Sequence, residues 1–219
     1  MYPDLLLFAK RPIAGQVKTR LQPECSPQQA AHIASYLMRA TCELAVEYWP
    51  GDVYLYTWPN SNHPLFRELA NQFPVTLAVQ SDGDLGAKMN AALEEGIGRS
   101  GGAVIMGCDV PHCPGETLVR ASKYLCAGQE ILGPSNDGGY YLIGLRKNSR
   151  FLFADMDWGS SEIATKTLYR AKQEDRHLNL LPRLRDIDTW EDLVLVAEHY
   201  TPLKQFMSHD IGTPIYPRD

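Results

Sequence analysis

The chain alternates short apolar runs with segments whose apolar positions recur at helical spacing. Residues 4–9, 52–57, 75–80 and 103–107 are apolar or alternating runs of strand length. Residues 26–48 carry an inward stripe of apolar positions, and Ser26, Pro27 and Gln29 supply the start signals of a helix. A short helix over residues 63–72 and another after Gly86 complete an order of strands alternating with helices. This order predicts an α/β fold: a mostly parallel central sheet in a three-layer sandwich.

The second half of the chain continues this pattern less regularly. A helix over residues 114–126 precedes two strands, 130–134 and 140–145, which flank a glycine-rich turn. Helices over 160–171 and 190–199 and a strand over 177–180 follow, and we expect a loosely packed tail after Pro202. Because no repeat or linker composition interrupts the chain, we predict a single domain over residues 1–200 with a C-terminal tail, 201–219.

Composition excludes several classes of function. With 44% hydrophobic residues among 219, the chain can bury a large core. A net charge of -5 argues against a broad nucleic-acid surface, which needs clustered lysine and arginine. Its 5 cysteines lack the spacing of a disulfide framework or zinc site, and the apolar run at residues 5–9 is too short for a signal sequence or membrane span. We therefore expect a cytoplasmic protein.

A basic loop, residues 10–21, follows the first predicted strand and contains no acid. Cations beside glycine and proline at the carboxyl end of a parallel strand suit a backbone bent around a phosphate. An ordinary surface loop is the structural alternative. The residues proposed to contact phosphate or to shape this loop are Lys10, Pro12, Gly15, Lys18 and Arg20.

Several acidic residues lie where the sheet would present them to a ligand. Asp109 follows the strand at 103–107, which suits a ligand of Mg²⁺, although it also suits a turn or helix cap. Asp137 precedes Gly138 and Gly139, which would let a ligand approach the backbone, although Asp-Gly is also typical of a hairpin turn.

A second acidic pair lies near the last predicted helix. Asp186 and Asp188 are two residues apart, so an extended segment would direct both to one side. The structural alternative is that Asp188 and Glu191 form a capping box.

Two further segments offer binding groups. A strand-to-helix loop with an available helix N-terminus is a usual place for the ring or phosphate of a polar ligand. The residues concerned are Gln80, Gly83, Asp84 and Gly86. Trp158 and the residues after it are candidates to line the acceptor side, although packing and capping are the structural alternative.

Taken together and in order, these segments resemble the nucleotide-diphospho-sugar transferase superfamily, whose fold is called GT-A. Within it they are most similar to a bacterial family labelled glycosyltransferase-like, and more distantly to 2-phospholactate and molybdenum-cofactor guanylyltransferases. The segments that carry the resemblance are residues 8–21, Gly83 to Met89, Gly107 to Pro111, Gly133 to Leu145 and Asp186 to Thr189.

The resemblance implies a transferase that takes a nucleotide or nucleotide-sugar donor and a small acceptor. It implies that Lys18, Arg20 and Asp109 are catalytic, that Asp109 and Asp188 hold Mg²⁺ or Mn²⁺, and that the basic loop and the glycine-containing loops bind the nucleotide. A homodimer is compatible with it. Nucleotidyl and glycosyl transfer both stay open, because Cys108 and Val110 flank a single carboxylate where an Asp-x-Asp pair would decide. A catalytically silent nucleotide-binding module is the alternative function.

Overall fold

A computed structural model describes residues 1–147 and 149–211 of the chain. One seven-stranded sheet forms its centre, in the order β3-β2-β1-β4-β6-β5-β7, which confirms the predicted α/β class. The strands are β1 (Asp4–Lys10), β2 (Val53–Trp58), β3 (Val75–Val79), β4 (Ala103–Gly107), β5 (Glu130–Pro134), β6 (Tyr140–Leu145) and β7 (Leu178–Leu180).

The sheet is mostly parallel, as predicted. β1 pairs in parallel with both β2 and β4, and β2 pairs in parallel with β3. β6 runs against both of its neighbours because a tight turn joins it to β5 as a hairpin. Parallel strands end at the same edge, so the loops after β1 and β4 lie next to each other.

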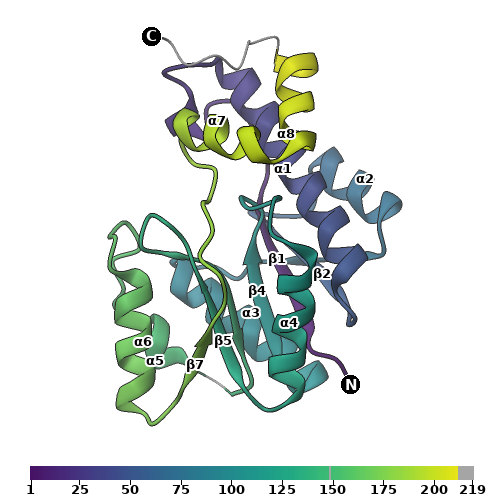
Figure 1. Ribbon diagram of the computed structural model, residues 1–219. Coiled ribbons are helices and arrows are strands. Elements are labelled where there is room, and N and C mark those ends of the chain that lie inside the picture. The colour runs from purple at the N-terminus through teal and green to yellow at the C-terminus, as the bar shows by residue number, and fades with distance from the viewer. Residues whose placement is uncertain (148, 212–219) are drawn as a thin grey trace.

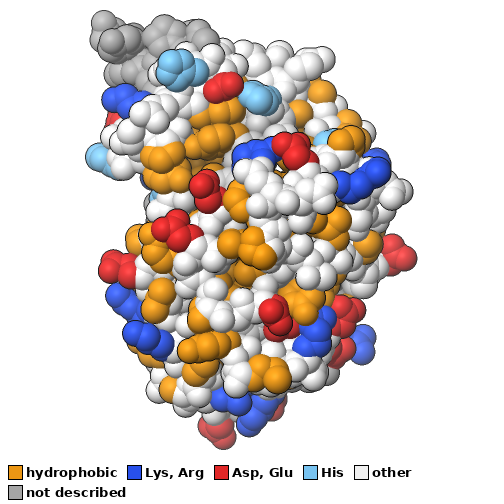
Figure 2. Space-filling view, turned by 90° about the vertical axis from the view of Figure 1, so that its right-hand side faces the viewer, with side chains coloured by type: hydrophobic (Ala, Val, Ile, Leu, Met, Phe, Trp, Pro, Cys, Tyr) orange, Lys and Arg blue, Asp and Glu red, His pale blue; other side chains and the backbone are white. Residues whose placement is uncertain are grey.

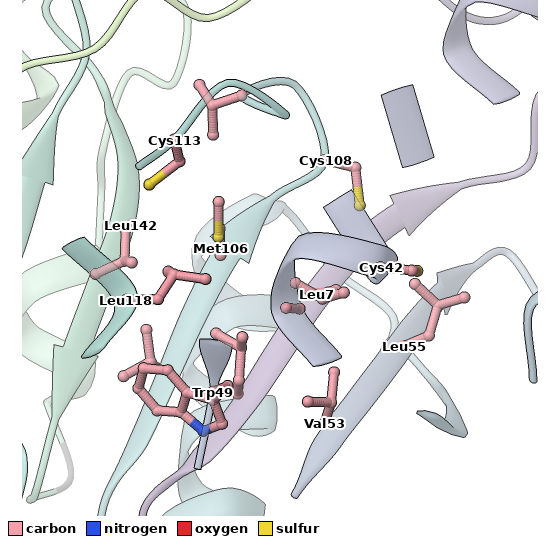
Figure 3. Close-up of a cluster of buried hydrophobic side chains, with 14 of the residues drawn as sticks. Leu7, Cys42, Trp49, Val53, Leu55, Met106, Cys108, Cys113, Leu118 and Leu142 are labelled. Atoms are coloured by element: carbon pink, nitrogen blue, oxygen red, sulfur yellow. The ribbon is translucent and has the colours of Figure 1, made fainter. Parts of the chain in front are cut away.

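Helices cover both faces of the sheet. α1 (Pro27–Tyr48), α2 (Pro64–Gln72) and α4 (Gly115–Cys126) pack on one face, and α3 (Leu85–Ser100), α5 (Arg150–Phe153) and α6 (Ile163–Gln173) on the other. Leu5 and Leu7 of β1 point into the first of these layers and Leu6 into the second, because successive strand side chains alternate. Figure 3 shows the first layer, where Leu7 and Met106 of the sheet meet side chains of the covering helices.

A third packed cluster lies beyond the carboxyl edge of the sheet. α7 (Trp190–His199), α8 (Thr201–Phe206) and a π-helical turn, η2 (Met207–Ile211), pack against the first half of α1 (Figure 1). Leu203 and Met207 are almost completely buried there. The expectation of a loosely packed tail after Pro202 is therefore wrong for residues 201–211, and residues 212–219 of that tail lie outside the described residues.

The segment between β7 and α7, residues 181–189, rises along the sheet to the C-terminal helices (Figure 1). Leu184 forms a bridge with Ser135, and the Ile187 amide donates to the Asp109 carbonyl oxygen at 3.0 Å. A short 3-10 turn, η1 (Thr19–Leu21), lies in the loop after β1. Residues from the beginning, middle and end of the chain thus meet at one edge of the sheet.

The surface carries both signs of charge. Figure 2 shows acidic and basic side chains dispersed among apolar and uncharged ones on one face of the molecule. Across the described residues, no helix has both the length and the apolarity needed to span a bilayer.

Candidate active site

Lys18 lies at the centre of the site. Its backbone has a φ of 46°, in the left-handed region that residues other than glycine seldom adopt. Its side chain is only 9% exposed, and Nζ lies 2.6 Å from Asp109 Oδ1 and 2.8 Å from Asp188 Oδ1. Nζ also donates to the carbonyl oxygen of Ile187 at 2.6 Å. The basic loop is therefore bent so that one lysine points inward, between two aspartates from distant parts of the chain.

The charge of Lys18 is maintained by these partners. Burial by itself would lower the pKa of the ammonium group, because a charge is costly to remove from water. The negative charges and hydrogen bonds of Asp109 and Asp188 outweigh this effect and raise the pKa above its usual value. Lys18 is thus a permanent cation at neutral pH, and it balances one of the two adjacent carboxylates.

The side chains around Lys18 remain accessible to a ligand. The Asp109 side chain is 44% exposed and that of Asp188 37%. Arg20 is 71% exposed, and its Nη1 lies 3.9 Å from Asp188 Oδ2, a weak contact. Lys10 lies at the rim, where its Nζ donates to the Gln16 carbonyl oxygen at 2.8 Å. Several cations can therefore turn toward an incoming anion.

Three carboxylates, Asp137, Asp186 and Asp188, form an aspartate cluster in which one oxygen atom of each lies within 4.8 Å of the others. Burial, followed by the negative charge of Asp137, raises the pKa of Asp186 to about 6. Carboxylate oxygens are the ligands that Mg²⁺ and Mn²⁺ prefer. A divalent cation would relieve the repulsion within the cluster, so these residues fit such an ion.

The hairpin turn between β5 and β6 places Asp137. Asp137 accepts hydrogen bonds from the Gly139 amide, at 2.8 Å, and from the Ser135 hydroxyl. Gly138 has a φ of 91°, and a Cβ there would lie 1.9 Å from the Ser161 carbonyl oxygen. Only glycine fits this position without moving the backbone. The predicted hairpin turn and the location of Asp137 in the cluster are both features of the structure.

Two cavities flank these aspartates. The first, about 350 Å³, is lined by the basic loop, α1 and the end of β4, and it contains Lys10, Lys18, Arg20, Asp109 and Asp188. The second, about 210 Å³, contains Asp137, Asp186 and Gly139 beside mainly apolar side chains from β1, α3, β4 and β6. The first cavity is therefore cationic and the second apolar with an acidic rim.

Other residues predicted to bind the nucleotide make contacts within the protein. Gln80 is buried and its amide donates to the Tyr56 carbonyl oxygen at 2.9 Å. Asp84 caps α3 by accepting from the Ala87 amide at 2.8 Å. Gly86 packs against Phe153, while Gly15 and Gly83 have positive φ angles and Pro12 is buried. A ligand-binding role for these residues stays a prediction.

The structural alternative for Asp188 is wrong. The capping box of α7 consists of Thr189 and Asp192, whose side chains bond to each other's amides at 3.2 and 2.9 Å. The register is shifted by one residue, which leaves Asp188 to face Lys18. Asp186 was not among the predicted metal ligands, although its two-residue spacing from Asp188 on an extended segment pointed to a shared face.

Comparison with known families bears on this arrangement. The family model "Uncharacterized protein conserved in bacteria (DUF2064)" matches residues 41–160, which include Asp109 and Asp137. This chain belongs to the DUF2064 family. No curated protein matches the DUF2064 chain.

Solved structures confirm the fold of this DUF2064 protein. It is 27% identical to the "putative nucleotide-diphospho-sugar transferase" of Desulfovibrio desulfuricans G20, with 94% of each chain covered and a TM-score of 0.80. Rv0371c from Mycobacterium tuberculosis H37Rv, in its complex with manganese, is 17% identical over 90% of this chain and 100% of its own, with a TM-score of 0.55. A cytidylyltransferase from Leptospira borgpetersenii is 12% identical over 97% and 98%, with a TM-score of 0.56. The last two likenesses show the fold alone.

Proposed function

We propose that this DUF2064 protein is a divalent-metal-dependent transferase that acts on a nucleotide donor. The observation that carries the proposal is the Lys18 ammonium held at 2.6 and 2.8 Å from two aspartates, where a cation-lined cavity meets an aspartate cluster. Lysine and arginine side chains that face carboxylates across a cavity provide both halves of a site for a metal-chelated phosphate. The manganese complex of Rv0371c, which has the same fold, agrees with this chemistry.

Each group has a distinct task in this proposal. Lys18 and Arg20, with Lys10 at the rim, hold the phosphate oxygens of the donor. Asp188, with Asp137 and Asp186 of the aspartate cluster, and Asp109 on the other side of Lys18 hold Mg²⁺ or Mn²⁺. A bound divalent ion supplies positive charge that stabilises a departing phosphate group. One well-placed charged or polar donor of this kind contributes about 3 kcal/mol to the transition state, roughly a hundredfold in rate.

The donor is better described as a nucleoside triphosphate than as a nucleotide-sugar. Lys10, Lys18 and Arg20 line one cavity of about 350 Å³ beside Asp109 and Asp188. With a divalent ion on the two aspartates, the three cations offer one cationic group for each phosphate of a triphosphate. Nucleotidyl transfer would then proceed by in-line attack of an acceptor oxygen on the α-phosphorus, with diphosphate leaving. Glycosyl transfer is the second candidate, favoured by the likeness to the Desulfovibrio protein.

The test is a thermal-shift panel of nucleoside triphosphates and nucleotide-sugars with Mg²⁺ or Mn²⁺, followed by mass spectrometry of the products. We expect at least one donor to raise the melting temperature only when the metal is present. Asp109→Asn removes one metal ligand, so it should abolish that shift and reduce turnover by about a hundredfold or more. Glu174→Gln, which neutralises an exposed acid at the end of α6, is the control for loss of charge.

Two results would contradict the proposal. An unchanged metal-dependent shift in Asp109→Asn would remove the role of that carboxylate. Nucleotide binding without product or diphosphate release for any acceptor tested would favour the silent nucleotide-binding module. A small-molecule acceptor, a cytoplasmic location and a homodimer are further parts of the proposal that this panel leaves as predictions.

A further inference from the structure

The second cavity differs in chemistry from the first. Its walls are mainly the carbon surfaces of side chains on the sheet face that α3 and α6 cover, and among its described lining residues there is no lysine, arginine or histidine. The side chains that form the apolar walls are Phe8, Leu85, Met89, Ile105, Tyr140, Trp158 and Ile163. A phosphate group placed here would find no cationic partner, whereas the first cavity contains three.

The rim strengthens this selection against anions. Asp137 and Asp186, two members of the aspartate cluster, line this cavity, while the third member, Asp188, lines the first. These carboxylates would repel a phosphate group held close to them, and the apolar wall would do little to screen that repulsion. A metal ion in the cluster would offset part of this repulsion at the rim, but it would not supply a positive group deeper inside.

The cavity also limits the size of its occupant. Its volume, about 210 Å³, is below the roughly 300–1,000 Å³ of sites for drug-sized ligands. A Cβ added at Gly107 would meet no atom within 4 Å, so the missing side chain leaves open space.

We infer that the second cavity binds the acceptor, and that this acceptor is a compact, uncharged hydroxyl compound, not a phosphate monoester. The inference rests on the proposed function, because it places the donor in the first cavity and the acceptor across the aspartates from it. Gly107 acts as a specificity-determining position, since the absence of its side chain leaves room for the apolar part of the acceptor.

The two cavities each contain a methionine that can report binding separately. Met89 lines the second cavity and is 4% exposed, while Met38 lines the first and is 3% exposed. The protein labelled with ¹³C at the methionine methyl groups is titrated with benzyl alcohol and, separately, with benzyl phosphate, both with Mg²⁺ present. We expect benzyl alcohol to shift the Met89 methyl signal and benzyl phosphate to bind there at least tenfold more weakly.

Substitution at Gly107 tests the location. Gly107→Ala fills open space and should weaken benzyl alcohol binding at least fivefold while the Met38 signal stays unchanged. Gly98→Ala is the matched control, because a Cβ at this α3 position also meets nothing within 4 Å and Gly98 lies outside both cavities. Equal or tighter binding of benzyl phosphate at Met89, or no Met89 shift with the alcohol, would overturn the inference.

The design separates this inference from the proposed function. Titration with a nucleoside triphosphate and Mg²⁺ reports at Met38, so an unmoved Met38 signal counts against the donor site. The preference between the alcohol and its phosphate ester is measured at Met89. Either signal can fail while the other behaves as expected.

Discussion

Replacing Lys18 with methionine should change metal affinity and nucleotide affinity in opposite directions. The Lys18 ammonium group contacts Asp109 and Asp188, the two carboxylates predicted to hold the metal. A metal ion that arrives alone must compete with this internal cation for their oxygens. Lys18→Met removes the competitor, but it also removes a cation that would hold the phosphates of the donor.

The contacts set the expected size of the effect. Nζ lies 2.6 Å from Asp109 and 2.8 Å from Asp188, and a hydrogen bond to a charged group contributes about 1.5–3 kcal/mol net. The incoming ion must displace at least one of these contacts. Lys18→Met lacks that contact from the start, so it should bind the metal about tenfold or more tightly than the parent, since 1.4 kcal/mol is tenfold. Loss of one phosphate contact lowers affinity for the metal-nucleotide complex by a similar factor.

Free Mn²⁺ measured by electron paramagnetic resonance gives the dissociation constant directly. The titration is made without nucleotide and then repeated with a nucleoside triphosphate, for the parent and for Lys18→Met. Lys10→Met is the matched control, because this lysine belongs to the same loop and bonds the Gln16 carbonyl oxygen. Circular dichroism and the melting temperature establish that each variant is folded.

The expected competition is contradicted if Lys18→Met binds Mn²⁺ alone no more tightly than the parent. That result would mean that the ammonium group and the metal do not compete for the same oxygens. A tenfold gain in Lys10→Met would also refute it, since the effect would then come from the net charge of the loop and not from contact with the aspartates.

Three further outcomes follow from the contacts described above. Asp186→Asn should stabilise the protein at neutral pH and have little effect at low pH, because the folded-state pKa is raised from 3.8 to about 6 and ionisation opposes folding only as the pH rises through this range. The gain in the free energy of unfolding is at most ~3 kcal/mol and is reduced by solvent screening. A constant difference between the melting temperatures of the parent and the variant from pH about 4 to about 7 would contradict this prediction. Gly138→Ala should lower both stability and turnover, since its Cβ would lie 1.9 Å from the Ser161 carbonyl oxygen. Unchanged urea unfolding and unchanged activity would count against the role of the β5–β6 turn in placing Asp137. Glu130→Ala should lower the free energy of unfolding, measured with urea, by about 3–5 kcal/mol, because it breaks a nearly buried ion pair with Arg176. Nucleotide binding by this variant should survive at low temperature.

Much of the fold could be predicted because local signals agreed with tertiary packing. β1 is a continuous apolar run since both of its faces are covered, and Ser26 accepts from the Gln29 amide at 3.2 Å as the sequence indicated. The approach of Lys18 to Asp109 followed from the parallel pairing of β1 with β4.

Other features depend on contacts that one segment does not specify. Pro202 suggested the end of regular structure, yet proline is also favoured in the first turn of a helix, and it occupies that position in α8. The sequence offers two overlapping capping boxes that differ by one residue, Asp188 with Glu191 and Thr189 with Asp192. The structure has the second, in which Asp188 is left to pair with Lys18. The raised pKa of Asp186 arises from burial and from Asp137, which lies far away in the sequence.

The ion pair between Lys18 and Asp188 joins residues separated by 170 positions. During synthesis, Lys18 leaves the ribosome long before its second aspartate has been translated. A nascent chain that stops short of residue 186 can form β1, β4 and the hairpin, but it lacks two of the three carboxylates of the aspartate cluster. Interrupted translation products would therefore lack the complete aspartate cluster, and the proposed activity would begin only after the segment that precedes α7 has been added.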